Sequence, residues 1–357
     1  MNLAKRTLQF VFVALALASF SSPQASAKAF SPSHCEAHLS SPIHRVETGW
    51  NPRRGAQAKS SPIAMSNESD DIEKTRELLM RGGDQDEPSK KRKKLIREMV
   101  AEMIGTFIIV QIGTASVMSG IFTNSLDLFS IASTWIVAVT LAISTTADVS
   151  GAHLNPAISI AFALLRPSAQ FGWSKVLPYS IAQLVGAVLA SGVNLAIYGT
   201  TIAAYEKANN VVRATASGLA SAKAFGEYYV DPVTAGVAFL AEAFGTGVLA
   251  FVIFSLTNKK NSTAKTGYVP LLIGATVGAL IATLAPLTQA GFNPARDFGP
   301  RIVAFLAGWK TVAFRGWWVY VFGPIVGAVV GATLADKVLH VDDDDKKVAR
   351  EETFAEE

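Results

Sequence analysis

The chain has 357 residues, of which 50% are hydrophobic and only 17% are charged, whereas soluble globular proteins carry about 25% charged residues. The charges concentrate near the two ends, and the long apolar runs between Glu102 and Asp336 exclude a soluble fold and indicate a polytopic membrane protein. The formal net charge of +4 is too small to indicate a nucleic-acid partner.

The first 29 residues have the parts of a signal peptide. A basic start with Lys5 and Arg6 precedes an apolar core at residues 8–20, and an Ala-x-Ala site ends at Ala27. The core is too short to span a bilayer, so we interpret residues 1–29 as a cleavable signal peptide. Residues 30–65 are rich in Ser, Pro, His and Arg and contain only two acids, which is typical of a transit peptide.

The junction of these two segments, SAKAFSPS, resembles the bipartite plastid presequence of algae with secondary plastids. In those presequences a Phe follows the signal cleavage site, and Phe30 stands in that place here. The resemblance implies a plastid membrane. The alternative is a secretory leader followed by a disordered linker, which implies a membrane of the secretory pathway or the plasma membrane.

Residues 66–96 form a polar region that ends in a basic run. Its acidic part, up to residue 89, is expected to be disordered or weakly helical. The basic run from Lys90 to Lys94 favours a topology anchor, and a contact with lipid headgroups is the alternative. The single cysteine, Cys35, lies before this region, so no disulfide or thiol chemistry is expected in the body. Residues 339–357 form a charged tail.

Six apolar segments between residues 97 and 338 each approach the roughly 20 residues that cross a bilayer. Two further apolar segments are too short to cross and therefore predict re-entrant half-helices. The connection from Gly199 to Pro232 carries no recognisable motif. The six long segments are 98–122, 130–149, 176–198, 234–257, 267–287 and 317–338, and the two short ones are 155–165 and 293–307.

The two halves of the body, 97–198 and 234–338, repeat one another. AEMIGTF from Ala101 matches AEAFGTG from Ala241, and LVGAVLA from Leu184 matches IVGAVVGA from Ile325. The triplet Asn-Pro-Ala occurs once in each half, at nearly the same offset. Because each half has three spans, an odd number, the second half crosses the membrane in the opposite orientation. Inverted repeats with broken helices are a known way to build a path across a membrane.

The triplets are Asn155-Pro156-Ala157 and Asn293-Pro294-Ala295. Asn is a preferred N-cap and Pro a preferred first helical residue, so each triplet predicts a helix start inside the membrane. Non-helical backbone at that depth must be buried in protein or line water. Two helix N-termini, each carrying about half a positive charge, repel cations and protons and donate hydrogen bonds to neutral solutes. The pattern predicts a channel for small uncharged polar solutes.

The chain resembles the aquaporin, or major intrinsic protein, family over about residues 97–338. The motifs that carry the resemblance are AEMIGTF, SGAHLNPA, AQLVGA, AEAFGTG, GFNPARDFGPR and GPIVGA. The resemblance implies an all-α membrane protein, an aquaporin-like bundle of six transmembrane helices plus two re-entrant half-helices arranged as an inverted repeat. It also implies a homotetramer with one pore per subunit.

The family places a selectivity filter at four positions, which are Trp135, Ile281, Ala290 and Arg296 here. Water-selective members resemble each other in having His at the position of Ile281. Trp135 and Ile281 would give an apolar wall, and Arg296 a fork of fixed donors opposite it. This set favours amphipathic solutes such as glycerol, with urea or ammonia as further candidates, together with water.

Residues outside and inside the filter point to two branches of the family. Asp297 and Arg301 resemble the glycerol-facilitator branch, whereas Tyr320 stands where that branch tends to have Pro and Gln289 replaces its usual Gly. Ala290 replaces its bulky Phe, and the four filter residues are closer to those of the plant nodulin-like intrinsic proteins.

Several ionisable residues in the body have two interpretations each. Glu102 and Glu242 could couple transport to protons, but the resemblance implies that each carboxylate anchors a re-entrant loop. His153 could be a metal ligand or a pH sensor, and we favour a hydrogen bond within its loop. Asp148 and Asp297 are expected to tie loops and half-helix N-termini.

Three classes of function compete. A passive channel fits the triplets, with a strictly water-selective channel as the alternative, whereas a secondary transporter would need ion-coupling groups at the membrane midplane. A membrane enzyme would need a nucleophile with a paired base, and the body has no Cys and only His153 within the membrane region. We therefore expect a channel for small neutral solutes and water that uses no cofactor or metal and contacts lipid but no nucleic acid.

Overall fold

A computed structural model describes residues 68–168 and 170–339. The predicted signal peptide, the transit-peptide-like segment, Cys35 and all of the charged tail except Leu339 lie outside the described residues. Asp86 begins the compact unit that contains the apolar helices. Within the described ranges the regular elements are all helical.

Six long helices and two short ones build this unit. The long helices are α2 (Glu68–Thr123), α3 (Leu128–Ser150), α5 (Trp173–Ala208), α7 (Ala235–Leu256), α8 (Val269–Thr288) and α10 (Trp317–Leu334). The short apolar helices are α4 (Pro156–Leu165) and α9 (Pro294–Ala304). The remaining turns are η1 (Ala216–Gly218), α6 (Leu219–Ala222), η2 (Ser262–Lys265), η3 (Phe305–Trp309), η4 (Lys310–Phe314) and η5 (Ala335–Leu339).

Among the described residues, six helices are long and apolar enough to cross a membrane, which confirms the six predicted spans. Three boundaries differ from expectation. Helix already begins at Glu68, within the region expected to be disordered or weakly helical, where residues 73–81 are mostly good helix formers. Helix α5 continues past 198 to Ala208, because Ile202 is buried in a cluster with Phe225 and Trp309. Helix α9 ends at Ala304, where a π-helical turn follows.

Side-chain caps set several helix starts. Asp127 accepts a hydrogen bond from the Ser130 backbone N–H at 2.8 Å and begins α3. Thr234 caps α7 in the same way through Val237. Gly151 ends α3 in a left-handed conformation with φ of 87°. The chain therefore leaves α3 at a defined point, directly before the first Asn-Pro-Ala triplet.

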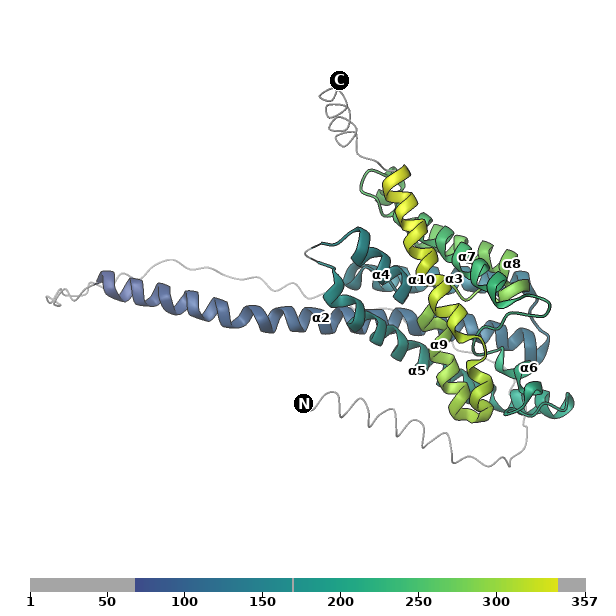
Figure 1. Cartoon of the computed structure of the whole chain (residues 1–357). Helices are drawn as coiled ribbons and strands as arrows, with labels where there is room; N and C mark the ends of the chain where they lie inside the picture. Colours follow the sequence, from purple (N-terminus) through teal and green to yellow (C-terminus); the bar gives the residue numbers. More distant parts are fainter. Residues whose placement is uncertain (1–67, 169, 340–357) are drawn as a thin grey trace, which may run out of the picture. The chain divides into compact units, whose positions relative to one another are not determined.

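Close backbone contacts hold the long helices together. Helix α10 packs along α7, and α3 packs along α8 (Figure 1). A Cβ atom at Gly327 would overlap the Ala243 carbonyl of α7, and one at Gly331 would overlap the Gly247 carbonyl. Gly274 and Gly278 of α8 approach carbonyls of α3 in the same manner. Small residues are what permits such close approach in a membrane, where apolar side chains gain nothing by leaving lipid.

We expect Gly327→Ala to destabilise the bundle by about 1–3 kcal/mol, because the added methyl group has no space at the α7 carbonyl. The apparent thermal unfolding midpoint in detergent, followed by tryptophan fluorescence, measures the effect. Gly236→Ala in α7 is the control, since an added Cβ there meets no atom within 4 Å. Equal midpoints for the two variants would contradict a backbone contact at Gly327.

Candidate functional site

The two half-helices begin at the asparagines of the triplets. Asn155 Oδ1 accepts the Ala157 N–H at 2.9 Å and so caps α4. Asn293 Oδ1 accepts the N–H groups of Ala295 at 3.0 Å and Arg296 at 3.2 Å and so caps α9. Pro156 and Pro294 occupy the first helical positions, where the missing N–H costs nothing. Both predicted helix starts are present.

Each asparagine also bonds to the loop of the other half. Asn155 Nδ2 donates to the Phe292 carbonyl at 2.9 Å, and Asn293 Nδ2 donates to the Leu154 carbonyl at 2.7 Å. These crossed bonds bring the two helix starts together. A side-chain amide has two N–H groups, so each asparagine keeps one donor that these bonds do not use.

The loops that enter the half-helices have an unusual backbone. Ala152 and Leu154 in the first loop, and Ala290 and Phe292 in the second, all have φ between 49° and 62°. A left-handed conformation costs a residue with a side chain about 1–2 kcal/mol. The same positions are affected in both halves, so the inverted repeat reproduces the strain, and other contacts must hold the loops in place.

Two buried carboxylates make those contacts. Glu102 of α2 accepts the N–H groups of His153 at 2.9 Å and Leu154 at 2.7 Å. Glu242 of α7 accepts those of Gly291 at 3.1 Å and Phe292 at 2.8 Å. Both side chains are fully buried. Further donors complete the two sets: Ser150 and Gln183 for Glu102, and Thr288 for Glu242.

Two cavities meet at the four residues expected to form the filter. The cavity lined by His153, Phe162 and Thr257, here named the inner cavity, has a volume of about 250 Å³. The cavity on the side of Glu227 and Arg315, here named the outer cavity, has a volume of about 490 Å³. Trp135, Ile281 and Arg296 line both cavities, and Ala290 lines the inner one. The four residues that the sequence suggested for the filter therefore lie together where the inner and outer cavities meet.

The arrangement of Arg296 differs from the expected one. We expected its guanidinium to stand opposite an apolar wall, but its Cζ lies 4.4 Å from the centroid of the Trp135 ring, in a cation–π contact. Its Nη1 also forms an ion pair with Glu227 Oε1, and both side chains are about 5% exposed or less. Arg296 therefore has an aromatic partner from α3 and an acidic partner from the connection before α7.

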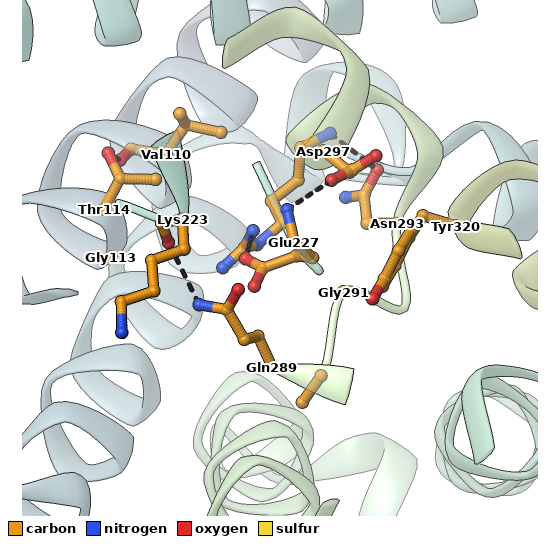
Figure 2. A network of polar contacts seen from close by, with 12 residues as sticks. Val110, Gly113, Thr114, Lys223, Glu227, Gln289, Gly291, Asn293, Asp297 and Tyr320 are labelled. Carbon is orange, nitrogen blue, oxygen red and sulfur yellow. Dashed lines mark hydrogen bonds and ion pairs between the residues drawn. The ribbon is translucent and has the colours of Figure 1, made fainter. Parts of the chain in front are cut away.

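Glu227 is the functional candidate that the sequence did not reveal. It lies in the connection from Gly199 to Pro232, which carries no recognisable motif. Figure 2 shows it next to Asp297, whose Oδ1 accepts the Glu227 backbone N–H at 2.7 Å. In the sequence, Glu227 is recognisable only as an acidic residue within this connection. Nothing in the neighbouring sequence distinguishes it from Glu206, an acid in the same connection.

Arg301 joins α9 to the same connection. Its Nε donates to Asp297 Oδ2 at 2.7 Å, its Nη2 donates to the Glu227 carbonyl, and its Nη1 donates to the Ala313 carbonyl at 2.8 Å. Asp297 therefore ties the connection to the half-helix, as its position suggested. Tyr228 lies against the Arg301 guanidinium, and burial raises the pKa of Tyr228 to about 12, although the arginine acts in the opposite direction.

Tyr320 and Gln289 support the second loop from two sides. The buried Tyr320 hydroxyl donates to the Thr288 carbonyl at 3.0 Å. Gln289 accepts the Tyr228 N–H at 3.0 Å. It also donates to the Lys223 carbonyl at 3.0 Å (Figure 2). Tyr320 and Gln289, two of the three residues that depart from the glycerol-facilitator pattern, thus position the backbone next to the third, Ala290.

The His153 ring packs among aromatic side chains. Its Nδ1 lies 3.2 Å from the Ser159 hydroxyl, and its ring stacks on Phe162 with centroids 4.7 Å apart. Among the described residues no group of three or more His, Cys, Asp or Glu side chains is placed to hold a metal ion. Asp148, which we expected to tie a loop, is exposed on α3.

Comparison with known proteins gives consistent results. The model of the family described as "Major intrinsic protein" matches residues 89–334. A glycerol uptake facilitator protein from Pseudomonas aeruginosa is 38% identical over 245 residues, which is 67% of this chain and 87% of that protein. The propanediol uptake facilitator PduF of Citrobacter freundii is also 38% identical, over 66% of this chain and 90% of its own length.

Among solved structures, the aquaglyceroporin from Plasmodium falciparum aligns with a TM-score of 0.58 and 27% identity, over 69% of this chain and 97% of that chain. The six spans, the two half-helices and the paired triplets agree with these matches. The chain is an integral multi-pass membrane protein of the major intrinsic protein family.

Proposed function

We propose that this protein is a passive channel for water and small neutral solutes, glycerol among them, that excludes ions and protons. The observation that carries the proposal is the meeting of two capped helix N-termini at the centre of the fold, where Asn155 and Asn293 each keep an unused amide donor. Relatives named as glycerol and propanediol facilitators support the choice of solute.

Trp135, Ile281, Ala290 and Arg296 are the proposed selectivity filter. Trp135 and Ile281 offer apolar surface, and Arg296 offers donors fixed by its contact with Glu227. A polyol presents carbons on one side and hydroxyls on the other, so it can contact both kinds of wall at once. Because Ala290 is small, the filter has room for a solute larger than water. A strictly water-selective channel is the alternative.

A proton-coupled transporter is disfavoured by how the intramembrane acids are used. Every oxygen of Glu102 and Glu242 accepts at least one hydrogen bond from the loops or from neighbouring side chains. We assign both residues, with His153 and Asp297, to holding the loops and half-helices. No enzymatic activity is proposed, because channels rather than catalysts make up the family.

The channel is proposed to act as a homotetramer in a lipid bilayer. Large apolar side chains are exposed along the helix faces, among them Phe129, Leu177, Leu240 and Phe244. Such faces must be covered by lipid tails or by the apolar faces of further copies. For the location, we propose a plastid membrane of an alga with complex plastids, on the basis of the presequence.

The first test is stopped-flow light scattering on proteoliposomes that contain the full chain. An inward glycerol gradient should be followed by rapid uptake, without any ion gradient, and an impermeant osmolyte should report water flow. The molecular mass of the solubilised assembly, from multi-angle light scattering, should be that of four chains.

The matched control in this test is Asn293→Asp. It retains the oxygen that caps α9 but replaces the donor to Leu154 with a negative charge, so conduction should be lost. Glycerol exclusion with rapid water flow would support the water-selective alternative, and a requirement for an ion gradient would support a transporter.

Glu227→Gln should lower glycerol permeability by about tenfold, a barrier increase of about 1.4 kcal/mol. The physical reason is that Arg296 loses the charge that fixes its guanidinium, although the side chain keeps its size. Asp231→Asn is the control, because Asp231 is an exposed acid that lines the same outer cavity. Unchanged permeability of the Gln variant would show that Glu227 does not position Arg296.

Residues 1–65 fused to a fluorescent protein should be imported into the plastid when expressed in an alga with complex plastids. Phe30→Ala should retain the fusion in the secretory pathway, because the resemblance gives this Phe the place after the signal cleavage site. Fluorescence microscopy distinguishes the locations. Secretion of the unchanged fusion would favour the secretory leader and linker instead.

A further inference from the structure

A polar clasp joins the end of half-helix α4 to the end of α7 and to η5, the π-helical turn that follows α10. Arg166 is the C-cap residue of α4. Its Nε donates to Asp336 Oδ2 at 2.8 Å, and its Nη2 donates to Asp336 Oδ1 and to the Phe254 carbonyl, the latter at 2.7 Å. Its Nη1 donates to the Thr257 hydroxyl at 3.0 Å. One guanidinium therefore fastens three helix ends.

The geometry of this clasp makes it stronger than an ordinary surface pair. Two N–H groups of Arg166 face the two carboxylate oxygens of Asp336, which is the bidentate arrangement that a guanidinium favours. The two side chains are only 22% and 20% exposed. Solvent therefore screens the pair less than it screens fully exposed charges.

A stack of rings connects the clasp with the inner cavity. The Arg166 Cζ lies 4.5 Å from the centroid of the Phe254 ring. That ring stacks on Phe162 with centroids 4.4 Å apart, and Phe162 stacks in turn on His153 at 4.7 Å. Phe162, His153 and Thr257 all line the inner cavity. A displacement of Arg166 would therefore change the wall along which a solute passes.

The clasp is specific to one side of the channel. The two triplets define which residues of the two halves correspond, and the residue that corresponds to Arg166 in the second half is Ala304. Ala304 is fully buried and has no charged group. The inverted repeat thus explains the loops and the half-helix starts but does not require Arg166. Because the Arg166 clasp occurs in one half alone, we assign it to the inner cavity and not to the scaffold that both halves share.

We propose that Arg166 is a positioning residue that, together with Asp336, holds the mouth of the inner cavity open for conduction. This inference rests on the proposed channel function. With the clasp intact, Thr257 donates to the Ile253 carbonyl at 2.7 Å and accepts from Arg166, so its hydroxyl does not retain a passing solute. Without the clasp, Phe162 and Thr257 are free to move into the path, and each solute leaves more slowly.

The test compares Arg166→Gln, Asp336→Asn and the double variant in proteoliposomes of the full chain. Glycerol permeability per inserted channel should fall about threefold in each single variant, and the double variant should be no slower, because the two residues act as one unit. The ratio of ribitol to glycerol permeability should also fall, since a longer polyol is hindered more by a displaced ring. Lys337→Gln is the matched control, as it removes an exposed charge next to Asp336.

A merely structural role would lower the unfolding midpoint and the amount of inserted protein but would leave the ribitol-to-glycerol ratio unchanged. Unchanged permeability in both single variants, or additive losses in the double variant, would overturn the proposal. If the unaltered chain conducts water but excludes glycerol, the solute proposal fails, and water permeability of the same variants decides on the clasp. A chain that conducts neither would overturn the channel function and the clasp together.

Discussion

The backbone N–H groups of the two re-entrant loops are the constraint on which the rest of this structure depends. Chain that is neither helical nor solvated cannot remain at membrane depth unless its polar groups find partners within the protein. Glu102 and Glu242 supply those partners, each accepting two successive N–H groups from the re-entrant loop of its own half of the repeat. Once these bonds exist, left-handed residues such as Leu154 and Phe292 are tolerated, and both half-helices begin at asparagines that bond to one another's loops.

The same scaffold is completed differently on its two sides. On the outer side, Arg301 joins α9 to the connection that carries Glu227, and Glu227 pairs with Arg296. On the inner side, Arg166 joins α4 to the end of α7 and to η5, which follows α10. Each half-helix thus has one arginine that fixes its position, but the two arginines lie at different points along their helices. The duplication supplies the symmetric centre, and unrelated contacts distinguish the two mouths.

The sequence predicted the elements governed by local rules and by repetition. Six spans follow from apolar length, and the helix starts at Asn155 and Asn293 follow from capping chemistry and are present. Glu227 and Arg166 could not be predicted as partners of Arg296 and Asp336, because those pairs form only after distant segments come together. The contact between Arg296 and Trp135 was missed for a related reason, since a motif specifies which residues meet but not the rotamer of a long side chain. The length of α5 was missed because its last turns are held by the burial of Ile202 against distant residues, which the apolar run does not reveal.

In the proposed channel, several groups together exclude ions, and no single group has to act as the whole barrier. A cation approaching the centre meets two helix N-termini, whereas the carboxylates of Glu102 and Glu242 are already engaged by donors and cannot coordinate it. An anion finds the charge of Arg296 already paired with Glu227 and then meets apolar walls at Trp135 and Ile281, which cannot replace its water shell. A neutral polyol loses less on dehydration, because the asparagine amides and the guanidinium replace its hydrogen bonds while its carbons face the rings. Selection for uncharged solutes therefore arises from the combination of these groups.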